Sequence, residues 1–221
     1  MAALTVDAYL DTLRRSGLIE SDQLDSLLAE MEQQHQGMPG DALVVAQSLV
    51  ARELVTPWQN RMLLRGFRKG YFLGKYKLMA EVGAGGMSSV YLAEHTLLRR
   101  RVAVKVLHLQ RASNRSHLVR FYRESRITAA LDHPNIVRCH DFDTDGRFHY
   151  LVMEYVDGPS LQSLLDSHGP FEYALAADYI AQAADGLAFA HQVGLIHRDV
   201  KPANLLVNSK GVLKVTDLGL T

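Results

Sequence analysis

The sequence predicts an α+β fold that is preceded by an all-α module of helical hairpins. Two observations carry this prediction. Helix-like, leucine-rich segments fill residues 1–65, whereas short runs of strand length begin at residue 76 and helical periodicity returns after residue 158. With 221 residues, of which 48% are hydrophobic, the chain can form more than one core. We expect a helical module at 1–65, a linker at 66–75, a sheet domain at 76–155 and a helical part at 156–221.

Two stretches of the N-terminal module resemble each other, which predicts a repeated helical hairpin. One copy, YLDTLRRSGLIESDQLDSLL, starts at Tyr9, and the other, VAQSLVARELVTPWQNRMLL, starts at Val45, so that Gln23 corresponds to Gln59. Thr56 followed by Pro57 predicts a helix start, because threonine can cap the free amides and proline needs no hydrogen bond there. The leucine stripes predict a core between the hairpins. A docking or self-association role for the module is the alternative.

The residues after the linker predict an antiparallel sheet with one helix. Apolar or alternating runs at 76–82, 90–95, 101–107 and 150–156 have strand length, and 118–132 has helical spacing. After Gly158 we expect a short helix at 161–166, a long helix at 171–192 and short strands around 205–207 and 213–215.

Charge and cysteine content exclude several classes of protein. Lys+Arg and Asp+Glu each total 24, so nothing in the balance favours nucleic acid or an anionic membrane. The single cysteine, Cys139, cannot form an internal disulfide, and we expect a small buried hydrophobic residue in a reducing cytoplasm. Asp7 and Asp11 interrupt the first apolar stretch, so we expect no signal peptide. No apolar run approaches the length of a membrane span, so we expect a soluble chain with no membrane partner. The ten histidines lack zinc-ligand spacing.

A glycine-rich segment between two predicted strands is a candidate phosphate-binding loop. It runs from Val82 to Val90 and comprises Val82, Gly83, Ala84, Gly85, Gly86, Met87, Ser88, Ser89 and Val90. Glycines allow backbone amides to approach an anion, although a glycine-rich hairpin without a ligand is equally common.

Two opposite charges are predicted to face inward behind that loop. Lys105 stands in the apolar run VAVK, where an unpaired ammonium would be unfavourable. Glu124 lies on the apolar stripe of the following helix. Each alone could be a surface charge, but together they predict an ion pair.

The segments IHRDVKPANLLV and KVTDLG carry the strongest indication of chemistry. Asp199, Lys201 and Asn204 fall in one loop, and Asp217 follows the next pair of strands. Phosphoryl transfer needs these groups: a carboxylate to accept a hydroxyl proton, a cation for the moving phosphoryl group, and oxygen ligands for magnesium. The alternative is an ordinary Asx-rich turn.

From about residue 76 to 221 the chain resembles bacterial, eukaryotic-like serine/threonine protein kinases. GAGGMSSVY is similar to their phosphate-covering loop, VAVK to their strand-three lysine motif, HRDVKPAN to their catalytic loop and DLG to their DFG motif. The resemblance implies a kinase-like lobe with an antiparallel sheet and helix C, followed by a helical lobe. The N-terminal repeat resembles segments that precede kinase domains in planctomycete-type bacteria.

The resemblance also implies roles for residues. ATP and Mg²⁺ would be the cofactors, with Lys105 on the phosphates, Glu124 as its partner, and Asn204 and Asp217 on magnesium. The backbone of Glu154 and Val156 would bind adenine, while Asp199 and Lys201 would be catalytic. The lysine two residues after Asp199 implies a serine or threonine acceptor in a protein substrate.

The sequence departs from the family pattern at three places. Ser88 replaces the third glycine of the loop, and Leu218 replaces the phenylalanine of DFG. The resemblance stops at Thr221, so we expect the activation segment and later helices of the family to be absent. Two alternatives to an active kinase therefore stay open: a nucleotide-binding or scaffolding protein without catalysis, and an interaction protein that acts through the helical repeat.

Overall fold

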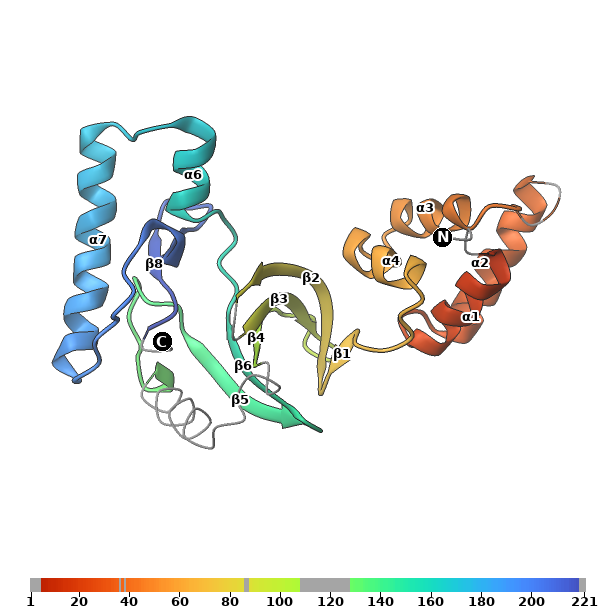
Figure 1. The fold of residues 1–221 in the computed structure, drawn as a ribbon, viewed down its shortest axis with the longest axis horizontal. Coiled ribbons are helices and arrows are strands. Elements are labelled where there is room, and N and C mark those ends of the chain that lie inside the picture. Colours follow the sequence, from red (N-terminus) through yellow and green to blue (C-terminus); the bar gives the residue numbers. More distant parts are fainter. Residues whose placement is uncertain (1–4, 36, 38, 86–87, 108–127, 219–221) are drawn as a thin grey trace. The chain divides into compact units, whose positions relative to one another are not determined.

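A computed structural model describes residues 5–35, 37, 39–85, 88–107 and 128–218 of the chain, which folds into two compact units. The N-terminal unit takes Met1–Gly83 and Tyr91–Arg100, and the C-terminal unit takes Ala84–Val90 and Arg101–Thr221. The fold is α+β, with helices and antiparallel strands in the order drawn in Figure 1. The predicted helix over 118–132 falls mostly outside the described residues.

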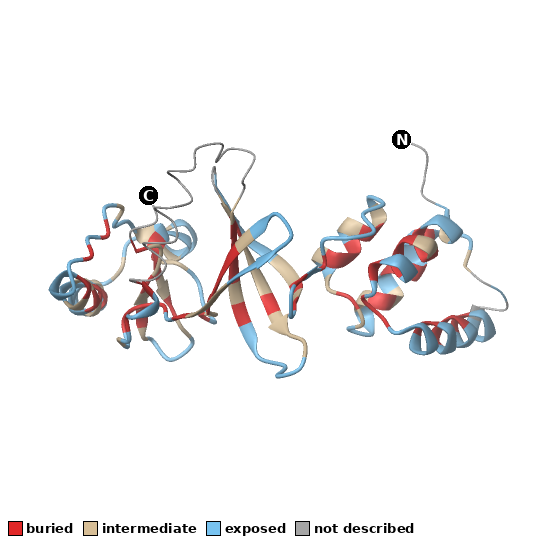
Figure 2. Ribbon diagram, turned by 90° about the horizontal axis from the view of Figure 1, so that it is seen from below, coloured by how far each residue is buried: buried red, intermediate tan, exposed pale blue. Residues whose placement is uncertain are grey.

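The repeated helical hairpins predicted from the sequence are confirmed. Their helices are α1 (Val6–Ser16), α2 (Ser21–His35), α3 (Ala42–Ala51) and α4 (Pro57–Leu64). Each helix turns its apolar residues inward, as the buried residues in Figure 2 show. The resulting core contains Tyr9, Leu13, Leu24, Met31, Val45, Leu49 and Leu63. The leucine stripes therefore pack the hairpins together, as expected.

Helix α4 begins where its sequence predicts. The Thr56 hydroxyl accepts a hydrogen bond from the Gln59 amide at 3.2 Å, and the Gln59 side chain accepts one from the Thr56 amide at 2.9 Å. This reciprocal pair is a capping box, and Pro57 occupies the first turn. Two amide donors at the helix start are thereby satisfied.

The N-terminal unit also contains strands, in the order β1-β2-β3. They are β1 (Phe72–Leu73), β2 (Tyr76–Ala84) and β3 (Ser88–His95), whose first three residues belong to the C-terminal unit. β1 pairs antiparallel with β2, with Leu73 opposite Tyr76. Residues 72–73 of the predicted linker are thus part of a sheet.

In the C-terminal unit the strand order is β4-β6-β5, and both pairings are antiparallel. The strands are β4 (Arg101–Leu107), β5 (Cys139–Asp145) and β6 (Phe148–Glu154). β6 packs Leu151 and Met153 against Val137, Cys139 and Val156 in a core of their own. β5, with the sequence CHDFDTD, was not predicted, because three aspartates give it low strand propensity and its pairing with β6 decides its conformation.

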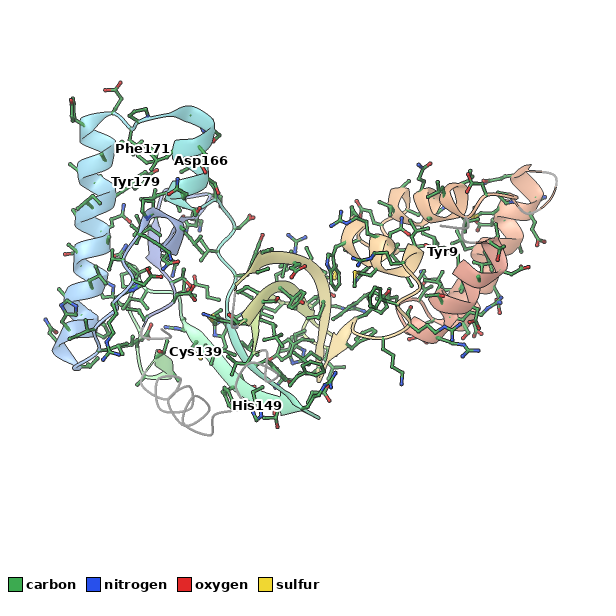
Figure 3. The ribbon with its side chains drawn as sticks, viewed as in Figure 1. Tyr9, Cys139, His149, Asp166, Phe171 and Tyr179 are labelled. Carbon is green, nitrogen blue, oxygen red and sulfur yellow. The ribbon has the colours of Figure 1, made fainter. Side chains whose placement is uncertain are left out.

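The rest of the C-terminal unit is helical, as predicted, with a short two-stranded sheet. Its elements are α6 (Leu161–His168), α7 (Tyr173–Gln192), a 3₁₀ turn η2 (Pro202–Asn204), β7 (Leu205–Val207) and β8 (Leu213–Val215). Phe171 and Tyr179, both labelled in Figure 3, meet edge to face with ring centroids 5.6 Å apart. Leu205, Leu213 and Val215 fill the core beneath α7.

Asn135 fixes the turn that precedes β5 to this helical part. Its side-chain amide donates to the Leu213 carbonyl at 2.9 Å and to Gln182 Oε1 at 3.1 Å. A Cβ atom at Gly186 of α7 would lie 2.8 Å from the Asn135 carbonyl oxygen, so only glycine lets the helix and the turn approach this closely.

Among the described residues, no helix is both long enough and apolar enough to cross a membrane.

Candidate active site

Lys105 and Asp217 form a direct ion pair in the C-terminal unit. Lys105 stands in the middle of β4, where strand register places it opposite Leu151, and its side chain is only 9% exposed. Its Nζ lies 2.7 Å from Asp217 Oδ1. A buried ammonium needs such a counter-charge. The prediction that Lys105 also pairs with Glu124 concerns a residue outside the described part of the chain.

The loop between α7 and β7 brings three predicted residues together. Lys201 Nζ lies 2.7 Å from Asp199 Oδ2, and the Asn204 amide donates to the Asp199 carbonyl at 2.8 Å and to Oδ2 at 3.2 Å. The bond from Lys201, followed by that from Asn204, holds the pKa of Asp199 below its usual range, against the opposing effect of desolvation. Asp199 is therefore a carboxylate at neutral pH, and both side-chain bonds use Oδ2 rather than Oδ1.

A buried histidine connects that loop to the segment that carries Asp217. His197 is 1% exposed; its Nδ1 accepts from the Asp199 amide at 3.2 Å, and its Nε2 lies 2.9 Å from the Thr216 carbonyl. An acceptor at Nδ1 and a carbonyl at Nε2 together define the neutral tautomer with its proton on Nε2. The Thr216 amide in turn donates to the Asn204 carbonyl at 3.0 Å. The relative positions of Asp199 and Asp217 are thus set by hydrogen bonds.

Two residues of the site adopt left-handed backbone conformations. Arg198 has φ 67° and Asp217 has φ 63°. Residues other than glycine pay roughly 1 kcal/mol for this conformation, and it persists where surrounding contacts impose it. Asp217 thus has a strained backbone itself, and Asp199 directly follows a strained residue. The hydrogen bonds around His197 hold both segments. Leu218, which follows Asp217, is 2% exposed and belongs to the core beneath α7.

The end of β6 and the segment that follows it contain the residues predicted to bind adenine. The Glu154 carboxylate lies 2.8 Å from Lys214 Nζ, and the Glu154 amide donates to the Arg138 carbonyl at 2.8 Å. Val156 is buried, and its carbonyl accepts from the Gly158 amide at 3.0 Å. A Cβ atom at Gly158 would lie 1.9 Å from the Val207 carbonyl oxygen, so this bend requires glycine.

Most of the described residues of the glycine-rich segment lie in strands, since residues 82–84 end β2 and residues 88–90 begin β3. The Gly85 amide donates to the Ser88 carbonyl at 2.8 Å, and Ser89 is buried. Val82, 54% exposed, and Gly83 end the first segment of the N-terminal unit, whereas the other described residues, Ala84, Gly85, Ser88, Ser89 and Val90, belong to the C-terminal unit. The predicted loop residues Gly86 and Met87 lie outside the described part.

The predicted magnesium ligands have a donor set that suits this ion. Asn204 engages Asp199 through its amide nitrogen, which leaves the amide oxygen for a cation, and Asp217 supplies a carboxylate. Within the described ranges there is no group of three or more His, Cys, Asp or Glu side chains that could hold a metal. An amide and one carboxylate form an incomplete set, as expected for Mg²⁺ that takes its other ligands from phosphate and water.

Sequence reasoning missed His197, Thr216 and Lys214. His197 stands directly before Arg198 and Asp199, so the motif contained it, but nothing in its spacing indicated the Thr216 carbonyl as its partner. Lys214 alternates with apolar residues of β8, which is typical of a solvent-exposed strand face, yet it pairs with Glu154.

Comparisons with known proteins agree on the part of the chain that forms this site. Residues 76–221 match the protein kinase domain. The serine/threonine-protein kinase PrkC of Bacillus subtilis is 40% identical over 147 residues, which are 66% of this chain and 23% of that protein. The serine/threonine-protein kinase PknB of Mycobacterium tuberculosis H37Rv is 44% identical over 150 residues, with 66% and 24% covered. The chain therefore spans about a quarter of the length of these curated relatives.

Proposed function

Because the chain belongs to the protein kinase family, we propose that it transfers the γ-phosphoryl group of ATP to a serine or threonine hydroxyl of a protein. The single observation that carries this proposal is the arrangement of Asp199, Lys201 and Asn204, which are hydrogen-bonded to one another and tied through His197 to the segment of Asp217. A carboxylate, a cation and magnesium ligands thus occur together, as the reaction requires.

Asp199 would orient the acceptor hydroxyl and receive its proton. The hydroxyl oxygen forms a bond to the γ-phosphorus as the bond from that phosphorus to the ADP oxygen breaks, and the proton passes to Asp199 Oδ1. With its pKa lowered by Lys201, Asp199 is a weak base, so it would take the proton late, when the hydroxyl has already become acidic. Its main contribution would be orientation of the hydroxyl.

Two lysines would neutralise phosphate charge. Lys105 would release Asp217 and hold the α- and β-phosphates instead. Lys201 lies beside Asp199 and would face the transferred phosphoryl group. Fixed charges of this kind stabilise the transition state without reorganising.

Asn204 and Asp217 would hold magnesium, which neutralises the phosphate oxygens when bound. The bonds between Asp217 and Lys105 and between Asn204 and Asp199 support this assignment, because each side chain is already held by one partner. Ser88 of the glycine-rich segment would add a hydroxyl donor to the phosphates.

The backbone after β6 would bind adenine. The Glu154 amide and the Val156 carbonyl take part in hydrogen bonds within the chain. The Glu154 carbonyl and the Val156 amide would therefore form the hydrogen bonds to adenine. Val156 would also place its side chain against the ring.

We further propose a cytoplasmic location, supported by the lone buried cysteine, and a protein substrate.

A thermal-shift titration of the whole chain with Mg·ATP, followed by a phosphotransfer assay on a protein rich in serine and threonine, tests the proposal. ATP should raise the melting temperature only with magnesium, and label should appear on serine or threonine. Lys105→Met and Asp217→Ala should lose both effects. Full phosphotransfer by Lys105→Met would overturn the assignment, and binding without phosphotransfer in the unmodified chain would favour the alternative of a nucleotide-binding protein without catalysis.

A further inference from the structure

A buried glutamine of the helical module is hydrogen-bonded to the strand that leads into the glycine-rich segment. Gln59 of α4 is fully buried, and its Nε2 donates to the Leu78 carbonyl of β2 at 2.6 Å. Its Oε1 accepts from the Thr56 amide, so both ends of the side-chain amide are used. A buried amide with both ends bonded fixes its neighbours strongly, because each lost bond would leave an unsatisfied group.

Further contacts of α4 reach the same strands of the N-terminal unit. The Thr56 hydroxyl donates to the Met79 carbonyl at 2.5 Å, next to the carbonyl that Gln59 binds. The Trp58 ring meets the Tyr91 ring of β3 edge to face, with centroids 5.7 Å apart. The side chains of Thr56, Trp58 and Gln59 thus contact β2 or β3.

The next residue of α4 is hydrogen-bonded to the other helices. Asn60 accepts from the Tyr9 hydroxyl at 2.7 Å and donates to the Ala46 carbonyl at 3.2 Å. Lys77 of β2 donates to the Leu18 carbonyl at 3.1 Å, in the turn that follows α1. α4 therefore connects the helical core to β2 through two adjacent buried polar side chains, Gln59 and Asn60.

β2 carries this connection toward the predicted phosphate-binding loop. The strand continues from Met79 to Val82 and Gly83, about 13 Å at the usual rise per strand residue. If the first residues of a paired strand are displaced, its last residues are displaced with them, because the backbone between has little freedom to bend. Small errors in the placement of phosphate-binding groups have large effects on binding and rate.

We infer that the second helical hairpin is a positioning element for β2, which it holds through Gln59 and Thr56, and that it thereby sets Val82 and Gly83 at the start of the glycine-rich segment. This inference rests on the proposed function. The repeat supplies a matched control, since Gln23 occupies the equivalent position in the first hairpin and is exposed.

The test compares Gln59→Leu with Gln23→Leu in the whole chain, using calorimetric titration with Mg·ATP. Gln59→Leu keeps the volume but removes both hydrogen bonds, and should weaken ATP binding by about fivefold or more. Gln23→Leu should stay within about twofold of the unmodified chain. Equal affinities in both variants would overturn the inference and leave the hairpin a purely structural addition.

A second variant and a second readout keep the outcome decisive. If Gln59→Leu does not fold, Thr56→Val removes the hydroxyl that donates to the Met79 carbonyl and accepts from the Gln59 amide, and it should weaken binding in the same direction. Amide hydrogen exchange at residues 80–83 should be faster in Gln59→Leu than in Gln23→Leu, and equal exchange would refute the positioning role. If the unmodified chain does not bind Mg·ATP at all, the proposed function fails, and exchange alone decides whether the hairpin positions β2.

Discussion

Lys105 Nζ lies 2.7 Å from Asp217 Oδ1, so the lysine expected on phosphate and the carboxylate expected on magnesium neutralise each other in the structure. Nucleotide binding would then exchange partners, since the lysine gains phosphate oxygens and the aspartate gains magnesium. Phosphate without magnesium would leave Asp217 beside uncompensated negative charge. We therefore expect ATP affinity to depend steeply on magnesium.

Replacing Lys105 by methionine should lower the rate of phosphotransfer by about 100-fold or more, while the chain still folds. Asp217 is about one-third exposed and tolerates the loss of its partner better than a buried carboxylate would.

A double-mutant cycle of Lys105→Met with Asp217→Asn, measured by urea denaturation, should give a coupling free energy of about 1 kcal/mol. Lys210→Met, at an exposed lysine, is the control, and a coupling near zero would mean that the pair does not form in solution.

Replacing Lys201 by methionine should raise the pKa of Asp199 toward its ordinary value. Lys201 is the largest cause of the lowered pKa, and it favours the charged carboxylate. A group with a lowered folded-state pKa stabilises the fold above its unfolded pKa and loses this contribution as pH falls through the lower value. The acidic limb of the pH–rate profile and a carboxyl NMR titration should both move to higher pH. No movement would show that Lys201 points away from Asp199 in solution.

Replacing His197 by alanine should destabilise the C-terminal unit by about 2–4 kcal/mol. The change leaves a cavity and removes the partners of the Asp199 amide and the Thr216 carbonyl. Thermal unfolding of this variant can be compared with that of His191→Ala, whose side chain is exposed at the end of α7. Equal melting temperatures in the two variants would rule out the proposed link.

Replacing Gly158 by alanine should destabilise the fold more than the same change at Gly186. The new Cβ would lie 1.9 Å from a backbone oxygen at Gly158 and 2.8 Å from one at Gly186. We expect about 3 kcal/mol at the first position and about 1–2 kcal/mol at the second. Gly40→Ala enters open space and should change the free energy of unfolding by less than about 0.5 kcal/mol. The reverse order in chemical denaturation would contradict this geometry.

The sequence predicted local structure well where one residue carries the physical cause. Thr56 and Pro57 define the start of α4 by capping, and alternation predicted most of the strands. β5 was missed because strand pairing, a tertiary effect, overcomes the poor propensity of its aspartates.

Long-range partners within the site were harder to predict. The motifs identified Asp199, Lys201 and Asn204 as a group, and these side chains are in contact. No pattern, however, indicated the pair of Glu154 with Lys214, sixty residues apart. Gln59 was aligned with Gln23, yet one is buried and the other exposed, because only the fold decides which hairpin faces the strands.

The single cysteine makes the chain suitable for site-specific labelling. Cys139 is buried, and burial raises the pKa of its thiol to about 11, so little reactive thiolate forms near neutral pH. A cysteine introduced at an exposed position, such as Leu97 with 84% exposure, would therefore react with maleimide dyes far faster than the native thiol. Fluorescent probes can then be attached without first removing Cys139.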